Sequence, residues 1–210
     1  MNSRQSVSVN LTAVQAVRKA VLLVAILLGA AFVVVGDSRW ASGTLAHESI
    51  EWFGLILIVV CILGRTLCTL YIGGRKIESL VQIGPYSVSR NPLYFFSILG
   101  AIGAGAQLGS LVLAFATGFV VWLIFLIVIF KEEQVLTERF GAAYAEYLAQ
   151  VPRLFPRMTL WKDVEKIEVN PRLVRMTALD ASVFLLSVPL AEGFEYLHDA
   201  GILPTWFILP

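Results

Sequence analysis

The segment Leu108–Phe130, LGSLVLAFATGFVVWLIFLIVIF, decides the fold class, because it is almost entirely apolar and carries no charge. A helix that crosses a bilayer needs about 20 such residues. The 210-residue chain is 58% hydrophobic and 15% charged, whereas soluble domains are about 45–50% apolar and about 25% charged. A core of this size could not bury so much apolar surface, and disordered chains are poor in apolar residues. The sequence therefore predicts an integral membrane protein.

Three more apolar runs predict further membrane helices: Ala20–Gly36, Trp52–Ile72 and Pro92–Gln107. Proline suits a first helical turn, because its missing N–H needs no partner there. Almost nothing separates the third run from Leu108–Phe130, so we expect these two helices to form an antiparallel hairpin. Small residues that let membrane helices approach closely lie in the third run, at Gly100, Gly103 and Gly105.

Basic residues orient these helices. They gather before the first run, between the second and third runs, and after the fourth, whereas the other loops hold only Arg39. By the positive-inside rule the basic segments lie in the cytoplasm. We expect a multi-pass protein with a cytoplasmic N-terminus, in a bacterial inner membrane rather than the endoplasmic reticulum. Because 16 basic residues nearly balance 15 acidic ones, no overall field selects nucleic acid as a partner.

Beyond the fourth run the pattern becomes amphipathic. Residues 133–150, followed by Pro152, predict an amphipathic helix. Its apolar stripe recurs at helical spacing, at Leu136, Phe140, Tyr144 and Tyr147. Periodicity alone fits a helix lying in the lipid headgroups and a helix packed over a pocket equally well. Tyrosines on the stripe favour the pocket, since burial in lipid would more readily select Leu or Phe.

The last apolar run, 177–190, reaches span length only when extended to Leu197. Four residues oppose its burial in lipid: Asp180, Pro189, Glu192 and Glu195. A fifth spanning helix and a re-entrant or surface-docked helix both remain open. We expect Arg65 to snorkel toward the cytoplasmic end of the second run, and His47 to be solvated in the outer loop. With no Cys-His cluster in the sequence, we expect no metal site.

Two polar blocks, 84–94 and 132–136, flank the predicted hairpin on its cytoplasmic side. The hairpin brings Arg90 close to Glu132 and Glu133, although 42 positions separate Arg90 from Glu132. A guanidinium and carboxylates beside a membrane need each other or a charged ligand. The residues alone leave both a simple Arg–Glu clamp and a ligand site open.

A series of motifs covers about residues 84–156, namely G-P-Y-x-x-x-R-N-P-L-Y, an apolar hairpin, E-E-x-x-L, F-G-x-x-Y-x-x-Y and V-P-R-L-F-P. In this order they resemble the isoprenylcysteine carboxyl methyltransferase family, which is related to integral-membrane phospholipid and thiol methyltransferases. One position departs from the family, which usually has R-H-P where this chain has Arg90-Asn91-Pro92. Asn91 can donate and accept hydrogen bonds, but it cannot titrate near neutral pH.

The resemblance implies methyl transfer from S-adenosylmethionine in a membrane pocket capped by the amphipathic helix. The cofactor would enter from the cytoplasm, and a lipophilic acceptor from the bilayer. Arg90 and Glu133 are the implied catalytic residues. Arginine suits a carboxylate, glutamate suits an ammonium or ribose hydroxyls, and tyrosine rings favour a nearby sulfonium. The implied cofactor-binding residues are Tyr86, Arg90, Asn91, Pro92, Tyr94, Glu132, Glu133, Leu136, Tyr144 and Tyr147.

The fold expected from these features is all-α, with four to five transmembrane helices and a cytoplasmic amphipathic helix over a cofactor pocket. We expect an N-terminal two-helix region (1–83), a methyltransferase-like core (84–156) and a C-terminal linker with an uncertain helix (157–210). A membrane reductase that binds NADPH, as sterol reductases do, and a non-catalytic scaffold or small transporter are the alternatives. The acceptor stays open among a prenylated cysteine, a phospholipid amine, a small thiol and another lipophilic acid.

Overall fold

The computed structural model describes residues 36–38, 43–73, 79–203 and 207–209, and the predicted first helix lies almost wholly outside these ranges. Its elements in chain order are β1 (Gly36–Ser38), α2 (Leu45–Ile72), α3 (Pro85–Val88), α4 (Pro92–Ala106), α5 (Leu111–Phe140), α6 (Ala142–Gln150), η1 (Met158–Leu160), α7 (Pro171–Ser182), η2 (Val183–Leu186), α8 (Ser187–Asp199) and β2 (Phe207–Leu209). The two short strands pair in parallel, with Gly36 opposite Phe207. Apart from this pair, the described elements are helical.

Helix α2 begins seven residues earlier than its apolar run predicts. The side chain of Thr44 caps its first turn by accepting a hydrogen bond from the amide of His47, as N-cap threonines do. The first turn of α2 contains polar residues, so hydropathy alone does not show where this helix begins. The expectation of a solvated His47 is therefore wrong, because this residue is 2% exposed.

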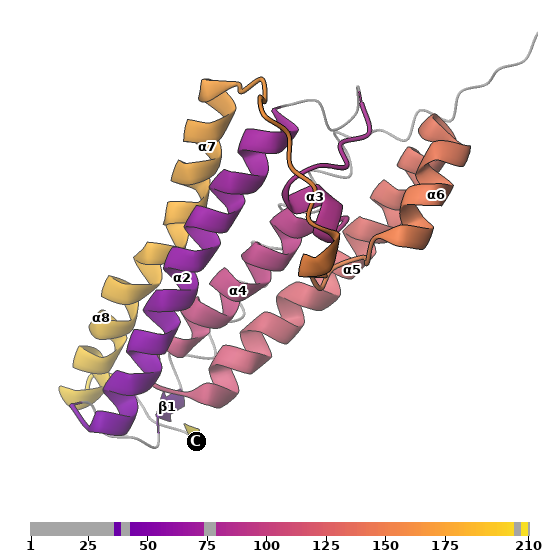
Figure 1. Cartoon of the computed structure of the whole chain (residues 1–210). Coiled ribbons are helices and arrows are strands. Elements are labelled where there is room, and N and C mark those ends of the chain that lie inside the picture. Colours follow the sequence, from indigo (N-terminus) through magenta and orange to yellow (C-terminus); the bar gives the residue numbers. More distant parts are fainter. Residues whose placement is uncertain (1–35, 39–42, 74–78, 204–206, 210) are drawn as a thin grey trace, which may run out of the picture.

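Helices α4 and α5 form the predicted antiparallel hairpin (Figure 1). They turn at Gly109, whose φ of 61° suits glycine, and the side chain of Ser110 caps α5. The predicted role of the small residues in helix packing is confirmed. A Cβ on Gly103 would lie 2.5 Å from the carbonyl oxygen of Gly54 on α2, and one on Gly100 would lie 2.6 Å from the Sγ atom of Cys61.

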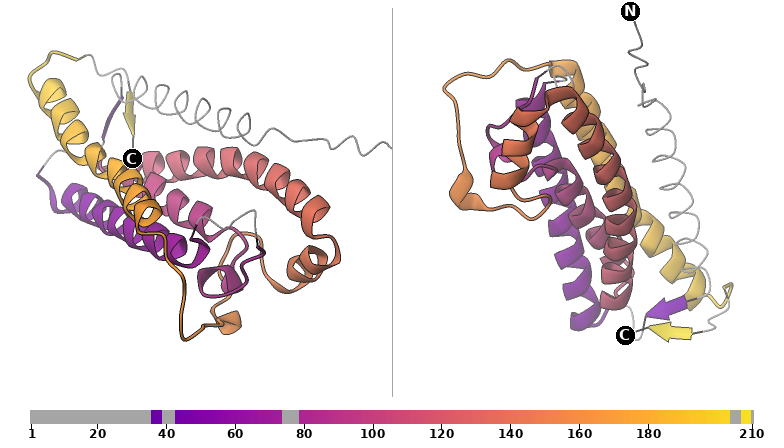
Figure 2. Two further views of the ribbon diagram at one scale, coloured as in Figure 1. Left: turned by 90° about the horizontal axis from the view of Figure 1, so that it is seen from above. Right: turned by 90° about the vertical axis from the view of Figure 1, so that its right-hand side faces the viewer.

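Helix α5 continues to Phe140, ten residues past the end of its apolar run. Its 30 residues span about 45 Å, more than the roughly 30 Å hydrocarbon core of a bilayer. The prediction of one amphipathic helix over 133–150 is wrong. Gly141 has a φ of 53° and ends α5, and α6 then starts in a new direction (Figure 2).

Helices α7 and α8 follow one another through η2 (Figures 1 and 2). Helix α7 packs along α2, and α8 contacts α4. Arg65 on α2 forms an ion pair with Asp180 on α7 and donates a 3.0 Å hydrogen bond from Nη1 to Ser97. The snorkelling prediction for Arg65 is therefore wrong: a carboxylate from the last apolar segment draws the guanidinium toward the bundle, which is the arrangement that charged groups inside a membrane require.

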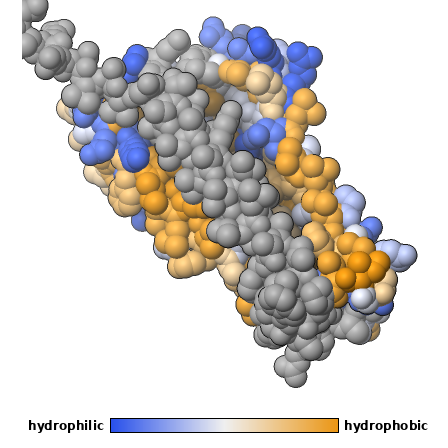
Figure 3. Space-filling model, turned by 180° about the vertical axis from the view of Figure 1, so that it is seen from behind, coloured by the Kyte–Doolittle hydropathy of each residue, from blue (hydrophilic) through white to orange (hydrophobic). Residues whose placement is uncertain are grey.

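Within the described part of the chain, three helical segments are long and apolar enough to cross a membrane: Leu45–Ile72, Leu111–Phe140 and Pro171–Asp199. Helix α4 is a shorter apolar helix. The last segment thus stays helical despite its acidic residues and Pro189, with the 3-10 turn η2 between α7 and α8. Hydrophobic side chains cover much of the visible length of the bundle, and hydrophilic ones gather toward its ends (Figure 3). The fold is that of an all-α membrane protein, as the sequence predicts.

Candidate active site

A cluster of three charged residues lies where α5 leaves the bundle. Glu133 is 8% exposed, and its Oε1 atom lies 3.2 Å from Nη2 of Arg90. Arg153 approaches the same carboxylate from the other side, with Nη2 at 3.0 Å from Oε2 and Nε at 3.2 Å from both oxygens. Arg90, Glu133 and Arg153 form what we call the charge cluster. Three separate parts of the chain therefore meet here, and the predicted approach of Arg90 to Glu133 is confirmed.

Arg90 is held in place through both its backbone and its side chain. Its amide donates a 2.9 Å hydrogen bond to the carbonyl of Pro152, and its Nη1 donates a 3.1 Å bond to the carbonyl of Leu148. Its Nε atom is buried and has no hydrogen-bond partner among the described residues. Buried donors without a partner are unfavourable, so this atom marks a place where a ligand acceptor would stabilise the site.

The segment that carries Arg153, residues 152–162, binds the loop around α3 and is called the strap below. Gly84 donates to the carbonyl of Lys162 at 2.7 Å, and Arg157 donates to the carbonyl of Val88 at 2.9 Å. Side chains add two bonds of 2.9 Å, in which Ser89 donates to the carbonyl of Leu154 and the amide of Lys162 donates to Ser87. These bonds fix the strap, and with it Arg153, against the start of α4.

Asn91 takes part in this arrangement. Its Nδ2 donates a 3.0 Å hydrogen bond to the carbonyl oxygen of Arg153, and the side chain does not cap α4. The side chain of Pro92, which follows, is fully buried in the first turn of that helix. The amide group of Asn91 therefore positions the backbone of Arg153, which in turn holds Glu133.

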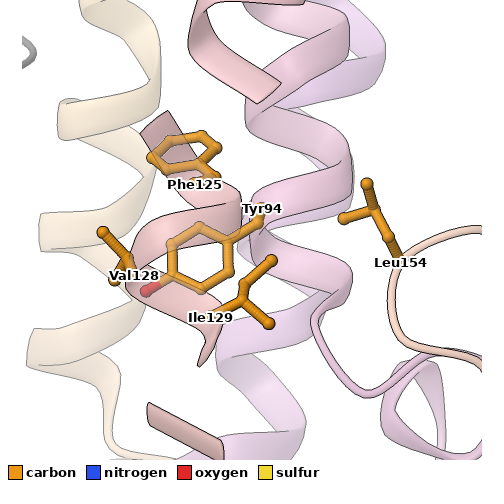
Figure 4. Close-up of a cluster of buried hydrophobic side chains, with 5 residues drawn as sticks. All are labelled: Tyr94, Phe125, Val128, Ile129 and Leu154. Atoms are coloured by element: carbon orange, nitrogen blue, oxygen red, sulfur yellow. The ribbon is translucent and has the colours of Figure 1, made fainter. Parts of the chain in front are cut away.

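Glu132 points to a different partner. The hydroxyl of Tyr94 on α4 donates a 2.9 Å hydrogen bond to its Oε1 atom. The ring of Tyr94 packs against that of Phe125, with the ring centroids 4.7 Å apart. Both belong to a buried cluster that includes Ile129 and Leu154 (Figure 4). This cluster lies directly beside the charge cluster and provides an apolar wall.

Helix α6 covers the other side. Tyr144 is 1% exposed and Tyr147 is 5% exposed, and Leu136 packs against them. Tyr147 donates a 2.6 Å hydrogen bond to the carbonyl of Tyr86, whose own hydroxyl is buried without a partner among the described residues. The tyrosine stripe thus packs inside the protein and does not lie on lipid.

Burial raises the pKa of these phenols above that of an ordinary tyrosine. It raises the pKa of Tyr144 to about 12, with the nearby carboxylate of Glu133 as the next cause. Burial likewise raises the pKa of Tyr147 and, well above its ordinary value, that of Tyr86. All three phenols are neutral at physiological pH, so they can donate hydrogen bonds or present ring faces but do not act as bases.

A surface hollow of about 450 Å³ opens next to this region, between residues 79–83 and 166–168, with Tyr71 in its wall. Leu80 lines the hollow and also packs against Tyr144 and Tyr147. Leu80 therefore separates the hollow from the buried tyrosines of α6 and contacts both.

Sequence reasoning missed Arg153 as a site residue. It lies in an irregular segment after α6, where no periodicity reveals which way a side chain points. The available signal was the V-P-R-L-F-P motif, which contains an arginine between two prolines.

Comparison with known proteins identifies the family. A family model described as phospholipid methyltransferase matches residues 49–143. The cobalt-zinc-cadmium resistance protein CzcN of Cupriavidus metallidurans is 34% identical over 173 residues, which is 82% of this chain and 79% of CzcN. Protein-S-isoprenylcysteine O-methyltransferase B of Arabidopsis thaliana is 31% identical over 126 residues, 54% of this chain and 63% of the plant protein. The chain belongs to the isoprenylcysteine carboxyl methyltransferase-like family.

A second metal-resistance relative, the nickel-cobalt-cadmium resistance protein NccN of Alcaligenes xylosoxydans xylosoxydans, is 30% identical over 177 residues, 84% of this chain and 82% of NccN. No solved structure matches the chain significantly. The family model includes Arg90 and Glu133 but ends before Tyr144 and Arg153. Arg153 and the tyrosines of α6 therefore lie outside the segment that the family model matches.

Proposed function

We propose that this protein transfers a methyl group from S-adenosylmethionine to a lipid-like acceptor in the membrane. The observation that carries the proposal is the charge cluster, in which Arg90 and Glu133 meet within the region that matches phospholipid methyltransferases. A structural clamp would need only one arginine and one carboxylate. Here two guanidiniums, two neighbouring carboxylates and neutral tyrosines gather beside an apolar wall.

These residues fit the proposed cofactor, which carries an ammonium, a carboxylate and hydroxyl groups. The buried donors without a described partner, Nε of Arg90 and the hydroxyl of Tyr86, fit a carboxylate and a ribose oxygen. Glu132 would receive the ammonium or ribose hydroxyls, because a carboxylate can accept further bonds beside the one from Tyr94. Tyr144 would present its ring face to the sulfonium.

The cofactor, when bound, supplies an electrophilic methyl group that passes to an acceptor lone pair while the sulfonium becomes a neutral thioether. The protein's part is to orient and to exclude water. Arg90 and Glu133 fix charge at one end of the site. Tyr144 of α6 and Leu136 of α5 cover the site, so proximity and desolvation supply the rate enhancement. An anionic acceptor then needs no base, which agrees with Asn91, an amide, in the position of the family histidine.

We also propose that the charge cluster faces the cytoplasm of a bacterium, on its inner membrane. Basic residues on this side of the helices, read with the positive-inside rule, support the orientation. Two of the relatives described above, from Cupriavidus and Alcaligenes, support the bacterial setting.

Binding and transfer assays test the proposal. Purified protein in detergent is titrated with S-adenosylhomocysteine and, separately, with NADPH. Arg90→Ala should weaken S-adenosylhomocysteine binding by about ten- to a hundredfold, the effect of losing a charge-assisted hydrogen bond of about 1.5–3 kcal/mol. Arg139→Ala, which removes an exposed arginine from the same end of α5, is the matched control and should bind normally.

The acceptor is then sought by supplying radiolabelled S-adenosylmethionine to membranes and separating lipid, protein and small-thiol fractions. Label in one fraction identifies the acceptor class. Binding of NADPH in place of S-adenosylhomocysteine would establish the reductase alternative, and binding of neither compound would leave a scaffold.

A second role, in tolerance of divalent metals, is favoured by the names of two relatives that the chain covers to 79% and 82% of their lengths. Growth of a deletion strain on graded cobalt, zinc, cadmium and nickel tests it. Complementation with Arg90→Ala shows whether that tolerance needs the proposed methyl transfer.

A further inference from the structure

A second cluster of polar side chains lies at the opposite end of the bundle, where α2 begins and α8 ends (Figure 1). His47 lies in the first turn of α2, Glu51 one turn later, and Glu195 comes from α8. The Nε2 atom of His47 is 2.8 Å from Oε1 of Glu195 and 3.4 Å from Oε1 of Glu51. Helix α2 is about 32 Å long from Glu51 to Ile72, and Ile72 lies beside α3, at the end of the bundle that holds the charge cluster. The trio is therefore remote from the charge cluster.

We propose that His47, Glu51 and Glu195 bind one divalent transition-metal ion, such as Zn²⁺. Imidazole nitrogen and carboxylate oxygen are ligands that zinc and its neighbours in the periodic table accept. One atom from each residue already lies within 4.8 Å of the other two. Metal binding at this trio does not depend on methyl transfer and adds a site to the proposed function.

The distances suit a tetrahedral ion. With metal–ligand bonds of about 2.0–2.2 Å, two ligands of a tetrahedron lie roughly 3.3–3.5 Å apart. The separation between His47 and Glu51 already has this value, and that between His47 and Glu195 needs to open by about half an ångström. The three groups carry two negative charges when the imidazole is neutral, which a divalent cation balances.

The surroundings orient the ligands. The α4–α5 turn closes over the imidazole at Gly109, where a Cβ would overlap Nδ1 of His47. On the other side, Gln107 donates a 2.9 Å hydrogen bond to the carbonyl oxygen of Glu51. These contacts hold the imidazole of His47 and the backbone of Glu51 in place. The imidazole side chain is 3% exposed, whereas the side chains of Glu51 and Glu195 are 29% and 22% exposed, so an ion can reach the site from the carboxylate side.

The same contacts would also serve a simple clamp between α2 and α8, in which a protonated His47 pairs with the carboxylates. Metal binding distinguishes the two. Tag-free, full-length protein in detergent is treated with a chelator, dialysed, and titrated with Zn²⁺ in competition with a fluorescent zinc indicator. We expect one Zn²⁺ per chain.

The variants Glu51→Gln and Glu195→Gln keep the shape of the side chains and remove the charge. Each should weaken zinc binding about tenfold or more. Glu48→Gln is the matched control, because Glu48 is exposed on the same turn of α2, and it should bind zinc as the wild type does. Absence of zinc binding to the wild type, or equal affinity in the Glu51→Gln/Glu195→Gln double variant, would overturn the proposal and leave only the clamp.

A measurement on the wild type keeps the test decisive if these variants do not fold. Co²⁺ is added to the chelator-treated protein and its visible spectrum recorded. Intense tetrahedral bands that Zn²⁺ displaces, together with a zinc-dependent rise in Tm, support the site. A spectrum like that of free aqueous Co²⁺ refutes it. Neither assay contains an S-adenosyl compound, so failure here and failure of methyl transfer are separate results.

Discussion

In the charge cluster, burial and the number of contacts give opposite predictions of which arginine interacts more strongly with Glu133. Arg153 makes three close nitrogen–oxygen contacts with Glu133, and Arg90 makes one. The side chain of Arg90 is only 8% exposed, whereas that of Arg153 is 39% exposed. Solvent screens an exposed pair to about 0.2–1 kcal/mol, while a charge-assisted bond in a buried pair is worth about 1.5–3 kcal/mol. We therefore expect Glu133 to couple more strongly to Arg90.

Two double-mutant cycles measure these couplings. Glu133→Gln is combined with Arg90→Gln in one cycle and with Arg153→Gln in the other. The free energy of unfolding is obtained from reversible denaturation in mixed detergent micelles. The expected coupling is about 1.5–3 kcal/mol for the Arg90 cycle and at most about 1 kcal/mol for the Arg153 cycle. Equal couplings, or a larger one for Arg153, would refute the reasoning that burial decides.

Three other changes follow from the described contacts. Asn91→Leu should lower the free energy of unfolding by about 1–3 kcal/mol, because it removes the partner of the part-buried carbonyl of Arg153. Normal thermal stability of this variant would show that the bond contributes nothing. Tyr144→Phe should reduce the loss of stability at alkaline pH. The pKa of Tyr144 is about 12 in the folded protein and about 10 in the unfolded chain, so the stability that Tyr144 contributes is present below pH 10 and lost between about pH 10 and 12. A profile of Tm against pH that matches the wild type would contradict this. Arg65→Leu should destabilise the protein more than the double change Arg65→Leu/Asp180→Leu, because the single change leaves the carboxylate without its ion-pair partner. If thermal denaturation shows the double variant to be the less stable of the two, the pair does not link α2 to α7.

Helices α2, α4 and α5 and two of the three residues of the charge cluster could be predicted from the sequence for a clear physical reason. Apolar runs of span length, and a short connection between two of them, leave few arrangements of the chain. The α4–α5 hairpin then brings Arg90 to Glu133 without any knowledge of side-chain packing.

The rest depends on features that periodicity does not contain. Arg153 reaches Glu133 from an irregular strap whose course is set by hydrogen bonds to the α3 loop. Gly141 ends α5 within a pattern that reads as one continuous helix. His47 is buried because the α4–α5 turn closes over its imidazole and Glu195 of α8 lies beside it. The positions of Arg153 and His47 depend on tertiary contacts, which override the local signal. The end of α5 depends instead on the positive φ of Gly141, which is a local feature.

The bonds between the strap and the α3 loop also set how this region exchanges hydrogen with solvent. Amides of Gly84 and Arg90 donate to the strap, while amides of Arg157 and Lys162 on the strap donate in the opposite direction. Neither segment has a long helix of its own, so each protects the backbone of the other. They form one cooperative unit of local opening, and the amides of both should exchange at a common rate, below that of the linker at residues 163–170. Ligands that bind Arg90 would slow that exchange across the whole unit, including at Lys162, far along the chain from the residue they touch.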